Sequence, residues 1–133
     1  MAQKDYYLNN KQLGMVFEHE VCDKFAKEGY WVHFITPDRR GAQPFDIIAV
    51  KNGKALAVEC KTLTNQAKYF PISRLEDNQI FAMEKWIACG NGQPIIAISW
   101  RNRMIMIPYS ILKEHEKINL EQEWNLLCQE ENI

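Results

Sequence analysis

Two carboxylates in this chain are spaced so that a β-hairpin would bring them together. Apolar residues flank Asn52-Gly53, the strongest short signal for a two-residue hairpin turn, because both positions tolerate positive φ. A symmetric turn pairs Lys51 with Lys54. It therefore places Asp46 opposite Glu59, as a non-hydrogen-bonded pair with Cβ atoms about 5 Å apart. Two carboxylates at this distance repel by roughly 3 kcal/mol at an effective dielectric constant of about 20. The pattern predicts a divalent cation that offsets the repulsion, since Mg²⁺ takes carboxylate oxygens.

A lysine on the same strand completes the candidate catalytic group. Lys61 follows Glu59 by two residues, so strand alternation puts both side chains on one face of the sheet. An ammonium there can orient or deprotonate an attacking water, or stabilise the charge that develops on a phosphate. Two acids for a cation and one ammonium for a phosphate predict the hydrolysis of phosphodiesters. The alternative is an ordinary salt bridge of Glu59 with Lys61 or Lys54, while Asp46 caps a turn.

Hydrophobic periodicity and turn signals predict the elements that position these residues. The predicted helices are residues 11–28, a helix that the capping box at Ser73 opens and that runs to about residue 89, and residues 111–116 and 120–130. The predicted strands are residues 30–36, 45–51, 54–62, 94–100 and 103–107, with a loop at 37–44. The order is helix, three strands, helix, strand, followed by a further strand and helix. It predicts one α/β domain with a mixed sheet over residues 1–133, whose core is residues 11–107 and whose helical extension is residues 108–133.

The two long helices before residue 90 have recognisable ends and faces. An apolar stripe at four-residue spacing marks the first, formed by Leu13, Phe17, Val21 and Phe25. Gly29 supplies its stop. Ser73-x-x-Glu76 predicts a capping box that opens the second helix, and Gly90 ends that helix.

Charge is distributed unevenly along the chain, although the formal net charge is only −1. Residues 114–133 carry one Lys and six Glu, whereas residues 36–74 carry seven basic and three acidic residues. A basic segment around two carboxylates suits a polyanionic substrate. The residues expected to contact DNA are Arg39, Arg40, Lys51, Lys54, Lys68 and Arg74. Each of them could equally be a solubilising surface charge.

Several classes of protein are disfavoured by the sequence. The four cysteines form no CxxC pair and the three histidines are scattered, so a zinc site is not expected and the cysteines are predicted to be buried thiols. No apolar run is long enough to cross a bilayer, and no signal peptide is apparent, so the cytoplasm is the expected compartment.

Taken together, Phe45-Asp46 and Val58-Glu59-Cys60-Lys61, with a helix before and a helix after, resemble the PD-(D/E)XK nuclease superfamily over about residues 11–107. This resemblance implies a restriction-endonuclease-like fold. It also implies that the two acids and the Cys60 backbone carbonyl bind Mg²⁺, for which Mn²⁺ can substitute, and that Lys61 serves catalysis. Many members carry a Glu on the first helix, and Gly14-x-x-x-Glu18 fits that pattern, with Glu18 holding the ion through a water. Glu20 is the weaker competitor, and a solvated carboxylate is the alternative. Proline is common directly before the Asp, where this chain has Phe45.

Within the superfamily the chain is most similar to Holliday junction resolvases of the archaeal and RecU-like kinds. The matching segments are Glu59–Thr62, Tyr69–Ile72, Asn78-Gln79, Pro94–Ile98 and Ile107-Pro108. Gln79 matches a glutamine near the site of RecU-like proteins and joins the expected DNA-binding residues; a surface helix amide is the alternative. RecU-like proteins carry a long insertion where this chain has only residues 37–44, so its size is closer to the archaeal enzymes.

The resemblance implies a homodimer that acts on branched DNA. Met104–Ile107 and Trp124/Leu127 could face a partner, although core packing is favoured for them. Three functions stay open: a junction-resolving endonuclease, another nuclease of this fold (homing, restriction-type or repair), and a non-catalytic DNA-binding domain. The sequence favours them in that order.

Overall fold

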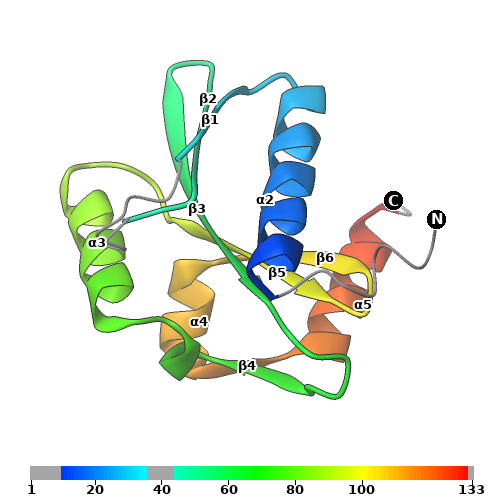
Figure 1. Ribbon diagram of the computed structural model, residues 1–133. Coiled ribbons are helices and arrows are strands. Elements are labelled where there is room, and N and C mark those ends of the chain that lie inside the picture. The colour runs from blue at the N-terminus through cyan, green and yellow to red at the C-terminus, as the bar shows by residue number, and fades with distance from the viewer. Residues whose placement is uncertain (1–9, 36–43, 132–133) are drawn as a thin grey trace.

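The computed structural model describes residues 10–35 and 44–131, and in these residues five strands form the central sheet. Figure 1 shows the arrangement of the elements. The helices are α2 (Asn10–Lys27), α3 (Asp77–Ala88), α4 (Tyr109–His115) and α5 (Leu120–Glu131), with a 3-10 helix η1 (Ile72–Arg74). The strands are β1 (Trp31–Phe34), β2 (Ile47–Lys51), β3 (Lys54–Thr62), β4 (Tyr69–Pro71), β5 (Ile95–Trp100), β6 (Arg103–Pro108) and β7 (Lys117–Asn119). Of the expected loop at 37–44, only Pro44 lies in the described part of the chain.

The main sheet is mixed, as predicted, with strand order β1-β2-β3-β5-β6. Only the β3–β5 pair is parallel, and the chain returns between these two strands through α3. The hairpin register is also confirmed, since Lys51 pairs with Lys54 and Ile47 pairs with Val58. Asn52 and Gly53 have φ values of 54° and 75°, as a type I′ turn requires.

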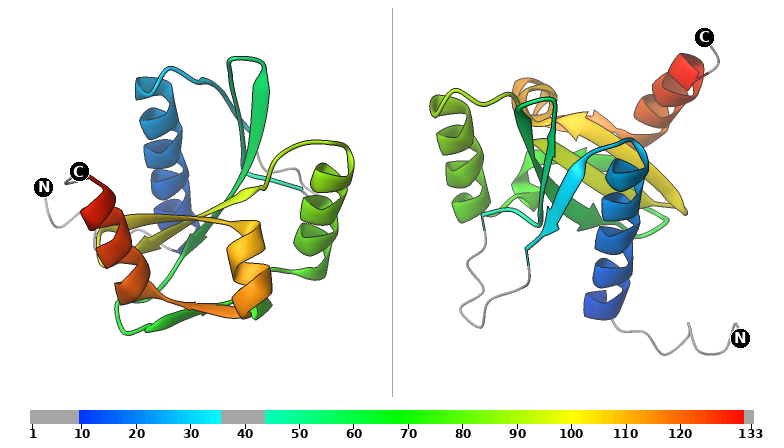
Figure 2. Two further views of the ribbon diagram at one scale, coloured as in Figure 1. Left: turned by 180° about the vertical axis from the view of Figure 1, so that it is seen from behind. Right: turned by 90° about the horizontal axis from the view of Figure 1, so that it is seen from above.

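Helices cover both faces of the sheet (Figure 2). On one face, Phe17, Val21 and Phe25 of α2 pack on a small cluster that includes Ile47 and Val58. On the other face, side chains of α3, α4 and α5 pack on the larger hydrophobic core. The chain leaves β3 at the end that carries Lys61 and returns to the sheet at the start of β5, after α3. The first turn of α3 therefore lies at the predicted site, where Gln79 contacts Lys61.

One residue of the predicted α2 stripe does not pack on the sheet. Leu13 is 46% exposed and lines a groove, whereas the other three residues of the stripe are buried. The helical period places Leu13 on the correct side of α2. Among the described residues, no strand covers that turn of the helix closely enough to bury Leu13.

A second, two-stranded sheet was not predicted. In it, β4 pairs antiparallel with β7, with Phe70 opposite Ile118. Both of these side chains are buried in the larger core, together with Leu112 and Leu120. The residues after 107 therefore share their core with the rest of the chain.

The predicted capping box at Ser73 is wrong. Ser73 belongs to η1, which closes with the Leu75 N–H donating to the Ile72 carbonyl. The N-cap of α3 is instead Glu76, whose side chain accepts the Gln79 N–H while the Gln79 side chain accepts the Glu76 N–H. A separate turn of 3-10 helix thus precedes α3, and the N-cap of α3 lies at Glu76 and not at Ser73.

Two smaller expectations can be compared with the described residues. The four cysteines are free thiols, but their predicted burial is wrong: Cys22, Cys60 and Cys128 are only partly buried, and Cys89, which follows the last turn of α3, is exposed. None of the described helices is long and apolar enough to span a membrane.

Candidate active site

An irregularity at the start of β2 turns Asp46 toward β3. The regular pairing ends at Ile47–Val58, and beyond it the Asp46 N–H donates to the Val58 carbonyl at 3.1 Å. Phe45 and Ile47 are both buried but lie in different hydrophobic clusters, so side-chain alternation breaks between them. This is the behaviour of a β-bulge, which re-aims a side chain. The Asp46 Oδ2 atom accepts the Cys60 N–H at 2.8 Å. The Asp46 side chain is therefore shifted from the expected position directly opposite Glu59.

The two carboxyl groups nevertheless meet. Glu59 is only 4% exposed, and its carboxyl donates a hydrogen bond to the Asp46 carboxylate. Burial, and then the negative charge of Asp46, raise the pKa of Glu59 far above its ordinary value. Burial also raises the pKa of Asp46, although the Cys60 N–H and the Lys61 charge oppose this rise. The predicted crowding of acids is therefore present.

Lys61 lies on the same face as Glu59 but does not pair with it closely. Its Nζ atom is 3.8 Å from Glu59 Oε1 and donates to Gln79 Oε1 at 3.0 Å. Gln79 Nε2 in turn donates to Glu59 Oε1 at 2.9 Å. The salt-bridge alternative is therefore only partly realised, because an amide from α3 stands between the two charges.

The first helix contributes a third acid. Glu18 is half-buried, and burial followed by the charge of Asp46 raises its pKa from 4.5 to about 7. Glu20, the weaker competitor, is exposed and lines the groove beside Leu13. Glu18 is thus the helix carboxylate that belongs with the acid cluster, which consists of Glu18, Asp46 and Glu59.

The acid cluster has the donor chemistry of a site for a hard cation. Three carboxylates with raised pKa values share the nearby charge of one lysine, and carboxylate and carbonyl oxygens are the ligands that Mg²⁺ prefers. Within the described residues, no three His, Cys, Asp or Glu side chains are already arranged to hold a metal ion. In the arrangement seen, their oxygens bind the Cys60 N–H, the Gln79 amide and each other.

The comparison with protein families decides between the functions that the sequence leaves open. The family model described as archaeal Holliday junction resolvase (Hjc) matches residues 9–126. The chain belongs to the archaeal Holliday junction resolvase family. This resolvase is accordingly a nuclease that binds DNA junctions and acts in DNA recombination, which confirms the first of the three expected functions. Nucleases of this family generally need a divalent metal ion.

A solved structure supports the fold of the resolvase. Hjc from Archaeoglobus fulgidus, a Holliday junction resolvase from an archaeal hyperthermophile, superposes with a TM-score of 0.63. The match covers 83% of this chain and 91% of that chain, at 19% sequence identity. At this identity the likeness concerns the fold alone, and it confirms the restriction-endonuclease-like class. No curated protein sequence matches the chain.

The residues of the resolvase that are expected to contact DNA fall into two described groups. Arg74 lies beside the site, because its Nη2 atom donates to the Thr62 carbonyl at 3.3 Å, and Lys68 is exposed just before β4. Lys51 and Lys54 lie at the hairpin tip, at the far end of β3 from Lys61. Arg39 and Arg40 lie outside the described residues.

Lys51 is engaged within the fold. Its Nζ atom donates to the Glu28 carbonyl at 2.6 Å and lies 5.3 Å from the centre of the Tyr30 ring. The hairpin-tip lysines are thus not brought to the acid cluster, and Lys51 has a structural role that its sequence position did not indicate.

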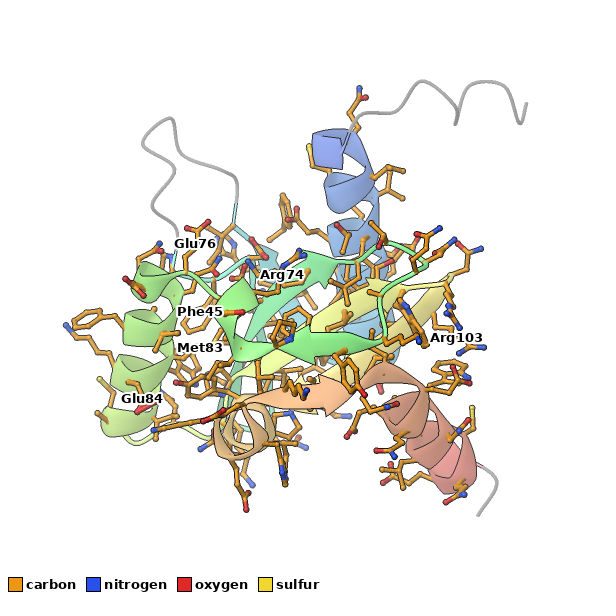
Figure 3. The ribbon with its side chains drawn as sticks, turned by 90° about the horizontal axis from the view of Figure 1, so that it is seen from below. Phe45, Arg74, Glu76, Met83, Glu84 and Arg103 are labelled. Atoms are coloured by element: carbon orange, nitrogen blue, oxygen red, sulfur yellow. The ribbon has the colours of Figure 1, made fainter. Side chains whose placement is uncertain are left out.

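A groove of about 1020 Å³ adjoins the site, and one of its lining residues, Arg103, is not indicated by the sequence as a candidate functional residue. It runs from Thr62 and Arg74 along α2 to the β5–β6 turn, where Arg103 lines it (Figure 3). The sequence predicts Arg103 only as the first residue of a strand. The signal that could have identified it is the Arg101-Asn102-Arg103 sequence between two strands. Arg101 and Asn102 form the tight turn there, and both have positive φ.

Proposed function

We propose that the resolvase is a Mg²⁺-dependent endonuclease, active also with Mn²⁺, whose active site consists of Glu18, Asp46, Glu59 and Lys61. The observation that carries the proposal is the convergence of three carboxylates with raised pKa values and one lysine at the start of α3. Crowded, partly desolvated carboxylates oppose folding, and such perturbed groups cluster at functional sites. A divalent cation supplies the missing positive charge.

Asp46, Glu59 and the Cys60 backbone carbonyl would hold the ion, and Glu18 would reach it through a water. When bound, the cation polarises the phosphate and acidifies water, so that hydroxide becomes available near neutral pH. The other contributions come from the protein. The Cys60 N–H fixes the Asp46 carboxylate, and the Lys61 ammonium stabilises negative charge that develops on the phosphate oxygens.

The direct test is an endonuclease assay on a four-way junction, a flap and a linear duplex of equal length, each with Mg²⁺, with Mn²⁺ and with EDTA. We expect symmetric nicks in the junction with either metal, slower cutting of the other two substrates, and none with EDTA. Cutting in EDTA would contradict metal dependence. Equal rates on all three substrates would contradict selectivity for branched DNA.

DNA would be held through its phosphates by Arg39, Arg40, Lys68 and Arg74, and by the hairpin-tip pair Lys51 and Lys54. Each phosphate contact adds about one unit to the slope of log affinity against log salt. Replacing Arg39 and Arg40 by Ala should flatten this slope, and Arg74→Ala should do so by about one unit. An unchanged slope would remove the residue concerned from the interface.

A homodimer would place two such sites on the symmetric strands of a junction. The surface best suited to it is an apolar pocket of about 540 Å³ between β2 and α3, lined by Phe45, Ile48 and Trp86. Phe81 lines this pocket and is 68% exposed. In a two-fold dimer, the Phe81 ring of each copy could therefore pack into the pocket of the other. The apolar segments considered from sequence are less suitable: Ile105 and Ile107 are buried, and Met104, Met106, Trp124 and Leu127 pack against the cores.

Light scattering on the purified chain tests the dimer. Phe81→Glu should give monomers, because it puts a charge into an apolar interface. Leu126→Glu is the matched control, since Leu126 is also an exposed apolar residue on a helix (53%), but on α5. A dimeric Phe81→Glu protein would contradict this choice of surface.

A further inference from the structure

The side-chain amide of Gln79 makes three hydrogen bonds within the active site. Its Oε1 atom accepts the Lys61 ammonium and the Glu76 backbone N–H, each at 3.0 Å. Its Nε2 atom donates to Glu59 Oε1 at 2.9 Å. One neutral amide therefore contacts Lys61, Glu59 and the N-cap of α3.

The orientation of this amide is determined by its neighbours. An ammonium and a backbone N–H can only donate, so the oxygen must face Lys61 and Glu76. The nitrogen then faces Glu59, whose carboxyl oxygen accepts. The Lys61 ammonium and the Glu59 carboxyl group both bond to the amide, and their nearest atoms stay 3.8 Å apart.

We propose that Gln79 is a positioning residue, which keeps the Lys61 ammonium and the Glu59 carboxylate apart and correctly placed for phosphodiester cleavage. The inference rests on the proposed function of these two residues. Without the amide, the ammonium and the carboxylate can close into a direct ion pair. Glu59 would then lose an oxygen needed for the cation, and Lys61 would be drawn away from the phosphate.

The cap of α3 makes this arrangement rigid. Gln79 is the third residue of the helix, and its bond to the Glu76 N–H is half of the capping box. The first turn of α3 therefore fixes the amide, and the amide holds Lys61 and Glu59. This role differs from the DNA contact expected from the sequence, because the amide bonds are used within the protein.

Single-turnover cleavage of a four-way junction by Gln79→Met tests the inference. Supporting groups of this kind typically change activity about 10- to 100-fold, so we expect the rate at saturating enzyme to fall within that range. The enzyme concentration that gives half the maximal rate should stay within about twofold of wild type. Gln122→Met is the matched control: Gln122 is also the third residue of its helix, behind the Asn119 N-cap, but is exposed on α5.

Glu76→Ala separates positioning from helix stability. It removes the other half of the capping box and leaves the Gln79 side chain in place. We expect it to lower the unfolding temperature about as much as Gln79→Met does, with a much smaller loss of rate. Equal losses of rate in the two variants would overturn the inference. An unchanged rate with a raised half-saturating concentration would also overturn it, because Gln79 would then be a DNA contact.

NMR of the side-chain amides gives a readout that does not depend on cutting. The Gln79 amide should be protected from hydrogen exchange, unlike that of Gln122, and should shift on Lys61→Met and on addition of Mg²⁺ alone. An unprotected Gln79 amide would overturn the inference whatever the activity. A wild-type protein that cuts no branched DNA would contradict the proposed function instead, and would leave the amide protection as the evidence for or against the role of Gln79.

Discussion

Helix α3, which carries Glu76 and Glu84 (Figure 3), runs between two regions in which the pKa values of carboxyl groups are shifted in opposite directions. At its start, Glu59 is buried among other acids and its pKa is raised. Further along the helix, Glu84 is exposed and accepts the Lys113 ammonium of α4 at 2.9 Å. That hydrogen bond, and a second one from Tyr109, lower the pKa of Glu84.

The opposite pKa shifts distinguish the candidate active site from an ordinary structural ion pair. Glu84 has its own counter-charge and remains in water, so its charged form is favoured in the folded chain. The acid cluster has more carboxylates than cations and is largely removed from water, so its charged form is favoured only when a further cation arrives. Substitutions in the acid cluster should therefore change cleavage and metal binding, whereas substitutions of Glu84 should not.

The largest difference concerns cutting. Asp46→Ala, Glu59→Ala and Lys61→Ala should each lower junction cleavage by roughly a thousandfold, because each removes a charge that acts on the reacting phosphate or its cation. Binding of the junction should be largely retained, measured by gel shift. Glu84→Ala should cut at the wild-type rate. Wild-type cutting by any of the first three variants would remove that residue from the mechanism.

The next difference concerns stabilisation by metal. A cation that binds only the folded chain stabilises it by about 2.7 kcal/mol at a hundred times its dissociation constant. Mg²⁺ should thus raise the unfolding temperature of wild type by several degrees. Glu59→Gln should lose this increase, and Glu84→Gln should keep it. An equal increase in both variants would place the cation elsewhere.

A smaller difference concerns pH in the absence of metal. The pKa of Glu18 is about 7 in the folded chain against an ordinary value of 4.5. Its contribution to stability is therefore fully present below pH 4.5 and is lost as the pH rises through 7. In EDTA, the unfolding temperature should fall between about pH 5 and about pH 8. Glu18→Gln should flatten this fall, while Glu20→Gln, an exposed position two residues further along α2, should not.

The smallest effect belongs to Glu84. Its pKa is lowered, so its contribution is present above pH 4.5 and disappears as the pH falls further. Exposed ion pairs contribute little, so Glu84→Gln should cost less than about 1 kcal/mol of unfolding free energy at neutral pH. Chemical denaturation of both proteins measures this. A loss of the same size in strong acid would show that the contact with Lys113 is not its cause.

Local signals in the sequence were sufficient for most of the main sheet. Asn52-Gly53 fixes the hairpin register because turn geometry and strand pairing are coupled, and the apolar run 94–100 identifies a strand buried on both faces. The register also predicts the meeting of Asp46 and Glu59, although in the structure this meeting is reached through the bulge at Asp46, beyond the last regular pair. The roles of Glu18, Asp46, Glu59 and Lys61 in catalysis remain predictions.

Features that depend on distant partners were not predictable. The strands β4 and β7 are three residues each and become strands only by pairing with each other. The bulge at Asp46 depends on Phe45 reaching the core on the α3 side, where it packs edge-on against Trp86. Ser is a stronger N-cap than Glu by type, so the sequence favoured Ser73, whereas the preceding turn of η1 selects Glu76.

The pairing of β4 with β7 also sets the order in which the molecule can assemble. These strands are separated along the chain by α3, β5, β6 and α4, so their contact closes a long loop. Contacts of large sequence separation carry a loop-closure cost and tend to form late in folding. A chain emerging from the ribosome therefore presents the hairpin with its acids well before β7 can fasten the segment that follows Lys61.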